Sequence, residues 1–187
     1  MNLGKNNLNK NKIKIAEITL KLLKKKSWDK ISLNEILRIS KNTDKSVNTK
    51  KELLFNLNRY VDFNLKKKIK YIEDSNPKDM LFELIMLRFD ILQKHRESFF
   101  KLFDFYKSRP QKSLVLIPSF LESMFLVASI ANIEINGIKG SLKIKGIFII
   151  YVATYFEWIN DDSESLDKTM TALDKNLDKF SKILNYI

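Results

Sequence analysis

The chain has 187 residues, of which 44% are hydrophobic and 30% are charged, and its formal net charge is +12. This balance is typical of a soluble globular protein and excludes a wholly disordered chain. With four glycines, three prolines and no cysteine, the composition favours helices over an all-β fold and excludes disulfides and thiolate sites.

Basic residues are concentrated in the N-terminal part of the chain. Residues 1–70 contain 19 of the 34 Lys and Arg residues but only 6 of the 22 Asp and Glu residues. An AT-rich genome would raise the lysine content everywhere, so it does not explain this asymmetry. We therefore predict a module that faces a polyanion, attached to a nearly neutral remainder.

Neither a signal peptide nor a membrane-spanning helix is expected. The segment Met1–Lys14 is polar and rich in lysine, without the apolar core of a signal peptide. The longest apolar run, Ile147–Phe156, is shorter than the roughly 18 residues that a spanning helix needs. We expect a cytoplasmic protein.

The first part of the chain is predicted to contain a flexible arm and one helix. Residues 1–11 form a polar, basic arm. A helix then covers about Lys12–Lys26, because its apolar residues repeat at helical spacing. These residues are Ile13, Ala16, Leu20 and Leu23, widened by Ile15, Ile18 and Leu22.

The stretch Ile31–Leu54 has the pattern of two short helices and the start of a long one. Ser32 occupies an N-cap position and Glu35 follows three residues later, which is the arrangement of a capping box. The residues Asn42 to Asp44 then interrupt the helical pattern with side chains that prefer turns. A very short helical segment follows, and a long helix runs from about Thr49 to Glu73. This is the layout of a helix-turn-helix, whose second helix enters the major groove of DNA.

The remaining helices form the predicted body. The boundary lies at residues 74–77, so that domain 12–73 contains the helix-turn-helix with its long connecting helix and domain 74–187 follows it. Helices are expected at about 77–94, 97–107, 110–132 with a kink at Pro118, and 141–160. Asp161, Asp162 and Ser163 are expected to cap a final helix.

Nothing in the sequence predicts an enzyme, a metal site or a cofactor. The single histidine, His95, has no partner at metal-ligand spacing, and we interpret it as a helix-end residue. Asp161, Asp162 and Glu164 resemble a metal cluster, but their place before a helix favours capping. The glycines match no phosphate-binding loop.

Two features of the body suggest binding. An aromatic-rich middle could line an apolar ligand pocket, with simple core packing as the alternative. Its candidate residues are Phe89, Phe99, Phe103, Tyr106, Phe120, Met124 and Tyr155. The final two helices have apolar stripes too broad for one partner, which predicts a four-helix interface between two copies of the chain.

The layout resembles the TetR family of bacterial transcription regulators along nearly the full chain. The resemblance is carried by residues 15–22, by SLNEI at 32–36, by TKKELL at 49–54, and by the stretches 81–92 and 150–177. It implies an all-α homodimer with an N-terminal three-helix helix-turn-helix domain that binds double-stranded DNA, and a larger C-terminal helical domain for an apolar effector and dimerisation. The implied DNA-binding residues are Ser32, Lys41, Asn42, Thr43, Lys45, Ser46, Lys50 and Lys51.

The recognition element departs from the family pattern. The stretch Ser40–Val47 is short, lacks glycine and lacks the two usual aromatic anchors, so that only Val47 could anchor it. The C-terminal part is also similar to the TetR-like accessory proteins of ubiquinone biosynthesis. That resemblance implies the alternative function, in which the protein binds an isoprenoid or other lipid without binding DNA and its basic half contacts an acidic membrane surface peripherally.

Overall fold

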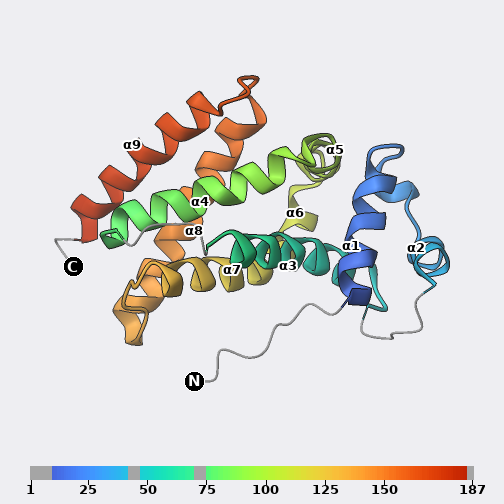
Figure 1. The fold of residues 1–187 in the computed structure, drawn as a ribbon, viewed down its shortest axis with the longest axis horizontal. Helices are drawn as coiled ribbons and strands as arrows, with labels where there is room; N and C mark the ends of the chain where they lie inside the picture. The colour runs from blue at the N-terminus through green and yellow to red at the C-terminus, as the bar shows by residue number, and fades with distance from the viewer. Residues whose placement is uncertain (1–9, 42–46, 70–74, 185–187) are drawn as a thin grey trace. The chain divides into compact units, whose positions relative to one another are not determined.

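Every regular element that the structure describes is helical. The computed structural model describes residues 10–41, 47–69 and 75–184, with side chains as far as residue 181 (Figure 1). The N-terminal elements are α1 (Lys10–Leu23), the 3₁₀ turn η1 (Trp28–Lys30), α2 (Leu33–Ser40) and α3 (Lys50–Lys68). They are followed by α4 (Pro77–Gln93), α5 (Arg96–Lys107), α6 (Pro110–Ser113), the 3₁₀ turn η3 (Leu114–Leu116), α7 (Ile117–Ile130), α8 (Gly137–Ile159) and α9 (Asp167–Leu184). The expected all-α class is confirmed.

The helices group into two compact units that do not follow the chain in sequence. The N-terminal unit consists of residues 1–67 together with 91–119, and the C-terminal unit consists of 68–90 together with 120–187. Helix α5 therefore belongs with α1, α2 and α3. The predicted boundary at residues 74–77 lies between α3 and α4, whereas α5, which follows this boundary in the chain, groups with the N-terminal helices.

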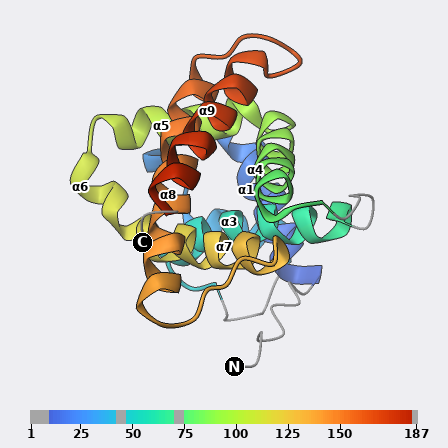
Figure 2. The ribbon, with the colours of Figure 1, turned by 90° about the vertical axis from the view of Figure 1, so that its left-hand side faces the viewer.

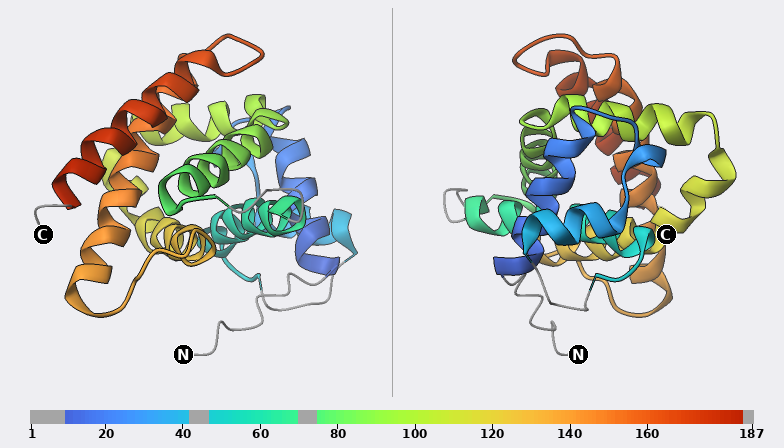
Figure 3. Two further views of the ribbon diagram at one scale, coloured as in Figure 1. Left: turned by 60° about the vertical axis from the view of Figure 1, so that its left-hand side comes forward. Right: turned by 90° about the vertical axis from the view of Figure 1, so that its right-hand side faces the viewer.

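The N-terminal unit has one continuous apolar core. Helix α2 crosses α1, and both contribute buried residues to it (Figure 3). Leu102 of α5 belongs to the same core, and Phe99 and Tyr106 of α5 pack against it. Helices α1, α2 and α3 with the turn η1 form the head of this unit. The most deeply buried core members from the head are Ile15, Ala16, Leu23, Ile36 and Leu53. Burial of this apolar surface is the main force that holds the short helices together.

Helix α5 is fastened to the C-terminal end of α1 by side-chain hydrogen bonds. The hydroxyl of Ser98 donates to the Leu20 carbonyl at 2.8 Å, and this contact is buried. The ammonium of Lys101 donates to the Lys24 carbonyl just beyond the end of α1. The Leu20 carbonyl also accepts the backbone N–H of Lys24 at 3.2 Å, and a cation such as the Lys101 ammonium is favoured at this end of a helix. Helix α5 is thus bound to the end of α1 by hydrogen bonds as well as by apolar packing.

In the C-terminal unit, α8 and α9 lie side by side and antiparallel (Figure 2). Gly146 of α8 permits the close approach, because a Cβ atom there would lie 1.9 Å from the ring of Phe180 of α9. Leu173 and Leu177 of α9 are buried. Helix α4 is joined to α9 by an ion pair between Lys78 and Asp178.

Several helix ends follow from local chemistry. Helix α4 begins at Pro77 as expected, and the Asn76 side chain accepts hydrogen bonds from the backbone N–H groups of Lys78 and Asp79, both at 3.1 Å. Near the kink expected at Pro118, the 3₁₀ turn η3 ends at Leu116 and the regular helix α7 begins at Ile117. Proline has no N–H to donate to the carbonyl four residues earlier, so the regular helix is interrupted there.

Two boundaries differ from the sequence expectation. Helix α8 begins at Gly137, four residues earlier than expected, and Gly140 in its first turn fits against the backbone of Ile135. A Cβ atom at Gly140 would lie 2.0 Å from the Ile135 carbonyl carbon, so only glycine fits. Helix α3 ends at Lys68, earlier than expected, and residues 70–74 lie outside the described part.

Asp161 caps α9 from the preceding loop, as expected for this acidic stretch. Its buried carboxylate accepts hydrogen bonds from the N–H of Thr169 at 2.8 Å and from the Thr169 hydroxyl at 2.7 Å. It also accepts from the N–H and the hydroxyl of Ser163. Burial alone would raise the pKa of Asp161, but these hydrogen bonds outweigh it and hold the pKa at about 2.

Candidate nucleic-acid interface

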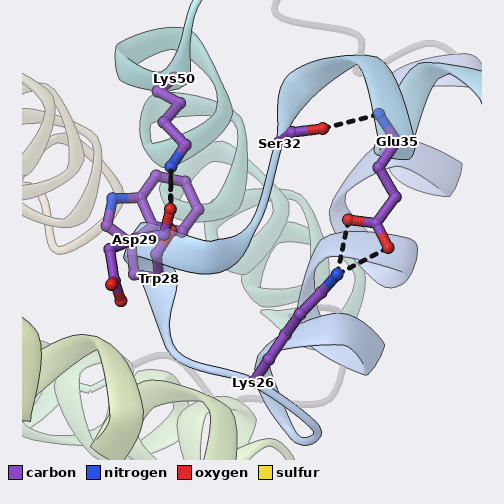
Figure 4. A network of polar contacts seen from close by, with 6 residues as sticks. All are labelled: Lys26, Trp28, Asp29, Ser32, Glu35 and Lys50. Carbon is purple, nitrogen blue, oxygen red and sulfur yellow. Dashed lines mark hydrogen bonds and ion pairs between the residues drawn. The ribbon is translucent and has the colours of Figure 1, made fainter.

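The start of α2 is fixed by a cap and an ion pair. The Ser32 hydroxyl accepts a hydrogen bond from the Glu35 N–H at 3.1 Å, which confirms the predicted N-cap. The Glu35 carboxylate accepts from the Lys26 ammonium at 2.6 and 2.7 Å (Figure 4). Hydrogen bonding from Lys26 lowers the pKa of Glu35, with burial acting in the opposite direction. Ser32 is therefore used in positioning α2, although it remains exposed.

The end of α2 has a left-handed backbone at a residue that is not glycine. Lys41 is the C-cap with φ 52° and ψ 37°, and its N–H donates to the carbonyls of Leu37 and Arg38. This conformation normally favours glycine, because a Cβ atom costs roughly 1–2 kcal/mol there. The Lys41 side chain is exposed and lies at the entry to the predicted recognition segment.

The predicted recognition residues themselves lie outside the described part of the chain. These are Asn42, Thr43, Lys45 and Ser46. The described residues on either side define where this segment leaves the head and where it returns. It leaves at Lys41 and returns at Val47, which is 2% exposed and belongs to the apolar core. Val47 is thus anchored, as expected for the only apolar residue of this stretch.

A second capping box starts α3. The Thr49 hydroxyl accepts a hydrogen bond from the Glu52 N–H at 3.1 Å, and the Glu52 carboxylate accepts from the N–H groups of Asn48 and Thr49 at 2.7 and 3.1 Å. Each partner thereby satisfies backbone donors that a helix start leaves free. The return of the chain into α3 is fixed within one turn.

The two lysines at the start of α3 differ in their surroundings. The Lys50 ammonium donates to the carbonyls of Trp28 and Asp29 at 3.0 and 3.2 Å and lies 5.2 Å from the centre of the Trp28 ring (Figure 4). Lys51 is exposed, and its ammonium lies 5.3 Å from the centre of the Phe55 ring on the same helix. Lys51 is the one available to an external anion.

Exposed lysines surround these elements in the N-terminal unit. They occur along α1, in the turn after it, at the end of α2 and on α3. The exposed set is Lys10, Lys14, Lys21, Lys24, Lys25, Lys30, Lys41, Lys51, Lys66 and Lys67. Clustered lysines of this kind attract phosphate backbones through long-range electrostatics and counterion release.

The predicted pocket residues are divided between the two units. Phe99, Phe103 and Tyr106 of α5 belong to the N-terminal unit, and the first and last of them pack against its core. Phe89 and Met124 are fully buried in the C-terminal unit. Phe120 and Tyr155 belong to that unit as well. The seven predicted pocket residues therefore do not form one cluster within a single unit.

Tyr151 and Arg88 are central residues of the C-terminal unit that sequence reasoning missed. Tyr151 stacks on Phe89 with ring centres 5.4 Å apart, and the buried Arg88 guanidinium lies 5.3 Å from the centre of the Tyr151 ring. The ring centres of Tyr155 and Trp158 lie 5.2 Å apart. The spacing of Tyr151 and Trp158 by seven residues on one helix was the available signal.

The described residues contain no group of three or more His, Asp or Glu side chains that could hold a metal. His95 is the N-cap of α5, and its ring meets Tyr60 edge-on at 6.0 Å. Burial lowers the pKa of His95, and the nearby Lys24 and Lys94 lower it further. This is the environment of a neutral helix-end histidine.

An apolar stripe runs along α8. Its members are spaced by four and seven residues, so they share one face of the helix. They are Ile138, Leu142, Ile149 and Phe156, with exposed fractions between 44% and 90%. Beside them, α8 and α9 border an open groove of about 590 Å³ lined by both small and charged residues, among them Ala153, Glu157, Ala172 and Lys175. Apolar patches of this kind on helices mark interaction surfaces.

One described stretch, Pro110–Ile130, is long and apolar enough to cross a membrane by length and composition. Its mean hydropathy is 1.9 and 28% of its apolar window is buried. This stretch differs from Ile147–Phe156, the apolar run that the sequence pattern indicates as the longest. A single helical stretch of this composition is weak evidence for a membrane span.

The helices define a two-part all-helical protein with capped short helices in a basic head. Its fold is a TetR-like fold. A crystal structure of the TetR transcriptional regulator from Nitrosomonas europaea ATCC 19718 matches 96% of this chain and 100% of that chain with a TM-score of 0.68 and 17% sequence identity. No family model matches the chain, and no curated protein matches it. At 17% identity the likeness establishes the fold alone.

Proposed function

We propose that this protein is a DNA-binding transcriptional regulator. The observation that carries the proposal is the basic head, in which capped helices α2 and α3 fix both ends of the segment 42–46. A helix-turn-helix reads base edges through such a segment and holds the phosphates with surrounding lysines. The expected DNA contacts are Lys41, Lys51 and the residues Asn42, Thr43, Lys45 and Ser46.

The experiment measures binding to duplex DNA from the region upstream of the protein's own gene. We expect nanomolar to micromolar binding with a steep salt dependence and a preference over a scrambled duplex of the same length. Equal affinity for both duplexes at physiological salt would contradict sequence-specific regulation. Absence of binding to either duplex at low salt would contradict any role on DNA.

The regulator acts as a homodimer through α8 and α9, and it responds to an apolar effector bound in the body. The apolar stripe on α8 supports the dimer, because a soluble monomer rarely exposes such a face. Light scattering should give twice the mass of the 22.0 kDa chain at micromolar concentration. Replacing Ile149 and Phe156 by Glu should yield the monomer, whereas the exposed loop variant Glu164→Gln should not.

A second candidate function is lipid binding without DNA binding, as an accessory protein of isoprenoid quinone synthesis. The weakly buried apolar stretch Pro110–Ile130 favours it. Native mass spectrometry of protein purified from its own cells would then detect a long-chain apolar molecule. If the purified protein is free of lipid and binds its own upstream DNA, this candidate is excluded.

A further inference from the structure

Adjacent lysines at the start of a helix would both be expected to face solvent, but the Lys50 side chain is half-buried. It is the first residue of α3, and positive charge is unfavourable at a helix N-terminus. Its ammonium instead leaves its own helix and reaches η1, a turn about 20 residues earlier in the chain. A position that opposes the helix dipole needs compensating contacts elsewhere.

The Lys50 ammonium makes three such contacts, all with the turn η1. Two backbone carbonyls, of Trp28 and Asp29, accept hydrogen bonds from the ammonium, and the Trp28 ring lies beneath it (Figure 4). Hydrogen bonds from a charged donor are the stronger kind, and a cation over an indole adds attraction. Burial lowers the pKa of Lys50, with the Asp29 carboxylate acting against this. The ammonium is thus partly withdrawn from water.

Trp28, the residue that Lys50 contacts, is itself immobilised from the other side. It is 3% exposed and lies in the apolar core of the N-terminal unit. Its side chain hydrogen-bonds with that of Tyr106 on α5. The contacts of Lys50 are therefore made with an immobilised residue, and they restrain the first turn of α3 relative to η1. This turn follows directly on Val47, where the recognition segment returns to the core.

We infer that Lys50 is a positioning residue that fixes the start of α3 to the Trp28 turn, and that Lys51 alone supplies the phosphate contact at this helix end. This inference rests on the proposed DNA binding. It separates two neighbouring lysines that sequence reasoning treated as equivalent. A lysine can bind a DNA phosphate only if its ammonium gives up its contacts within the protein. The Lys50 ammonium has three such contacts, with the Trp28 carbonyl, the Asp29 carbonyl and the Trp28 ring.

The dependence of DNA affinity on salt concentration distinguishes the two roles. Each phosphate contact that is lost reduces the slope of log K against log salt by about 0.9. We expect Lys51→Met to reduce the slope by this amount per contact. Lys50→Met should leave the slope unchanged and weaken binding roughly ten-fold at every salt concentration, because the start of α3 is no longer fixed to the Trp28 turn. A reduced slope for Lys50→Met, or unchanged affinity, would overturn the inference.

The charge-conserving variant Lys50→Arg provides an independent check and guards against simple misfolding. An arginine readily replaces lysine at a phosphate, so a phosphate contact would be restored to the affinity of the unmodified protein. The planar guanidinium does not reproduce a compact ammonium held between two carbonyls and a ring. We therefore expect Lys50→Arg to remain weaker than the unmodified protein at an unchanged slope. Full recovery would count against positioning.

A readout without DNA separates failure of this inference from failure of the proposed function. The chain has two tryptophans, and 5-fluorotryptophan gives each of them a fluorine NMR signal. One signal should shift in Lys50→Met and stay unchanged in Lys51→Met, because the Lys50 ammonium lies over the Trp28 indole and the Lys51 ammonium lies near the Phe55 ring. If the unmodified protein binds no DNA but this shift occurs, the proposed function fails while the contact stands. If neither signal shifts, the positioning role is refuted.

Discussion

Replacing Asp161 by alanine should destabilise the protein more than any other single change in the α8–α9 loop. The Asp161 carboxylate is fully buried and is the acceptor for both polar groups of Thr169 at the start of α9. Without it, the Thr169 N–H and hydroxyl keep no acceptor in a site closed to water. The hydrogen bonds from Ser163 are closer to solvent, so water can replace them.

The magnitude follows from the two buried donors. Leaving a buried donor unsatisfied costs about 1–3 kcal/mol, so two of them predict a loss of about 3 kcal/mol in the free energy of unfolding. That is a large share of the total stability of a domain, which is about 5–15 kcal/mol. Because Asp161 caps α9, we also expect weaker dimerisation.

The effect should depend on pH in a defined direction. The pKa of Asp161 falls from 3.8 to about 2 on folding. A carboxyl group whose pKa is lowered in the folded state contributes stability above about pH 4, and this contribution is lost as the pH falls from about 4 towards 2. At 1.36 kcal/mol per pKa unit it amounts to at most roughly 2 kcal/mol.

Urea unfolding followed by circular dichroism measures these differences, with Glu164→Ala as the control because Glu164 is an exposed carboxylate of the same loop. We expect the gap between the unmodified protein and Asp161→Ala to be constant from pH 7 to pH 5 and to narrow below pH 4. A loss no greater than that of Glu164→Ala, or a gap that widens in acid, would refute the reasoning.

Three further predictions concern backbone and packing. Lys41→Gly should raise the free energy of unfolding by about 0.5 kcal/mol, because relief of the left-handed strain exceeds the entropy cost of glycine; a lower denaturation midpoint would contradict this. Gly140→Ala should lower it by more than about 2 kcal/mol, since a Cβ atom cannot fit against Ile135; a neutral effect would show that the start of α8 moves freely. Ser98→Ala should cost about 1–2 kcal/mol and increase hydrogen exchange at the end of α1 near Leu20; unchanged exchange would show that packing alone fastens α5.

The features that the sequence predicted well depend on short-range rules. Ser32 and Glu35 form the expected cap because both partners lie within one helical turn. Helix α4 begins at Pro77 because proline suits the first turn of a helix and Asn76 suits the position before it. Asp161 was expected to cap α9, and the structure adds that it does so through the third residue of the helix. In each case the decisive partner is at most eight residues away.

The features that the sequence did not predict depend on contacts between distant segments. Helix α5 carries five aromatic residues. Periodicity identifies the buried face of such a helix without identifying what covers it. In the structure, Phe99 and Tyr106 pack against the apolar core of the N-terminal unit. The direction of the Lys50 side chain is a similar case, because it depends on a turn about 20 residues earlier. The residues 42–46, which carry the proposed base contacts, lie outside the described part.

The attachment of α5 to α1 has a practical consequence for dissecting the molecule. A fragment that stops at residue 73 would lack Leu102, Phe99 and Ser98, and it would expose the apolar surface that α5 covers together with the Leu20 carbonyl. Grafting such a fragment onto another body would therefore give an incompletely folded hybrid. A transferable cassette has to include α5, even though more than 20 residues of a different unit separate it from the head in the sequence.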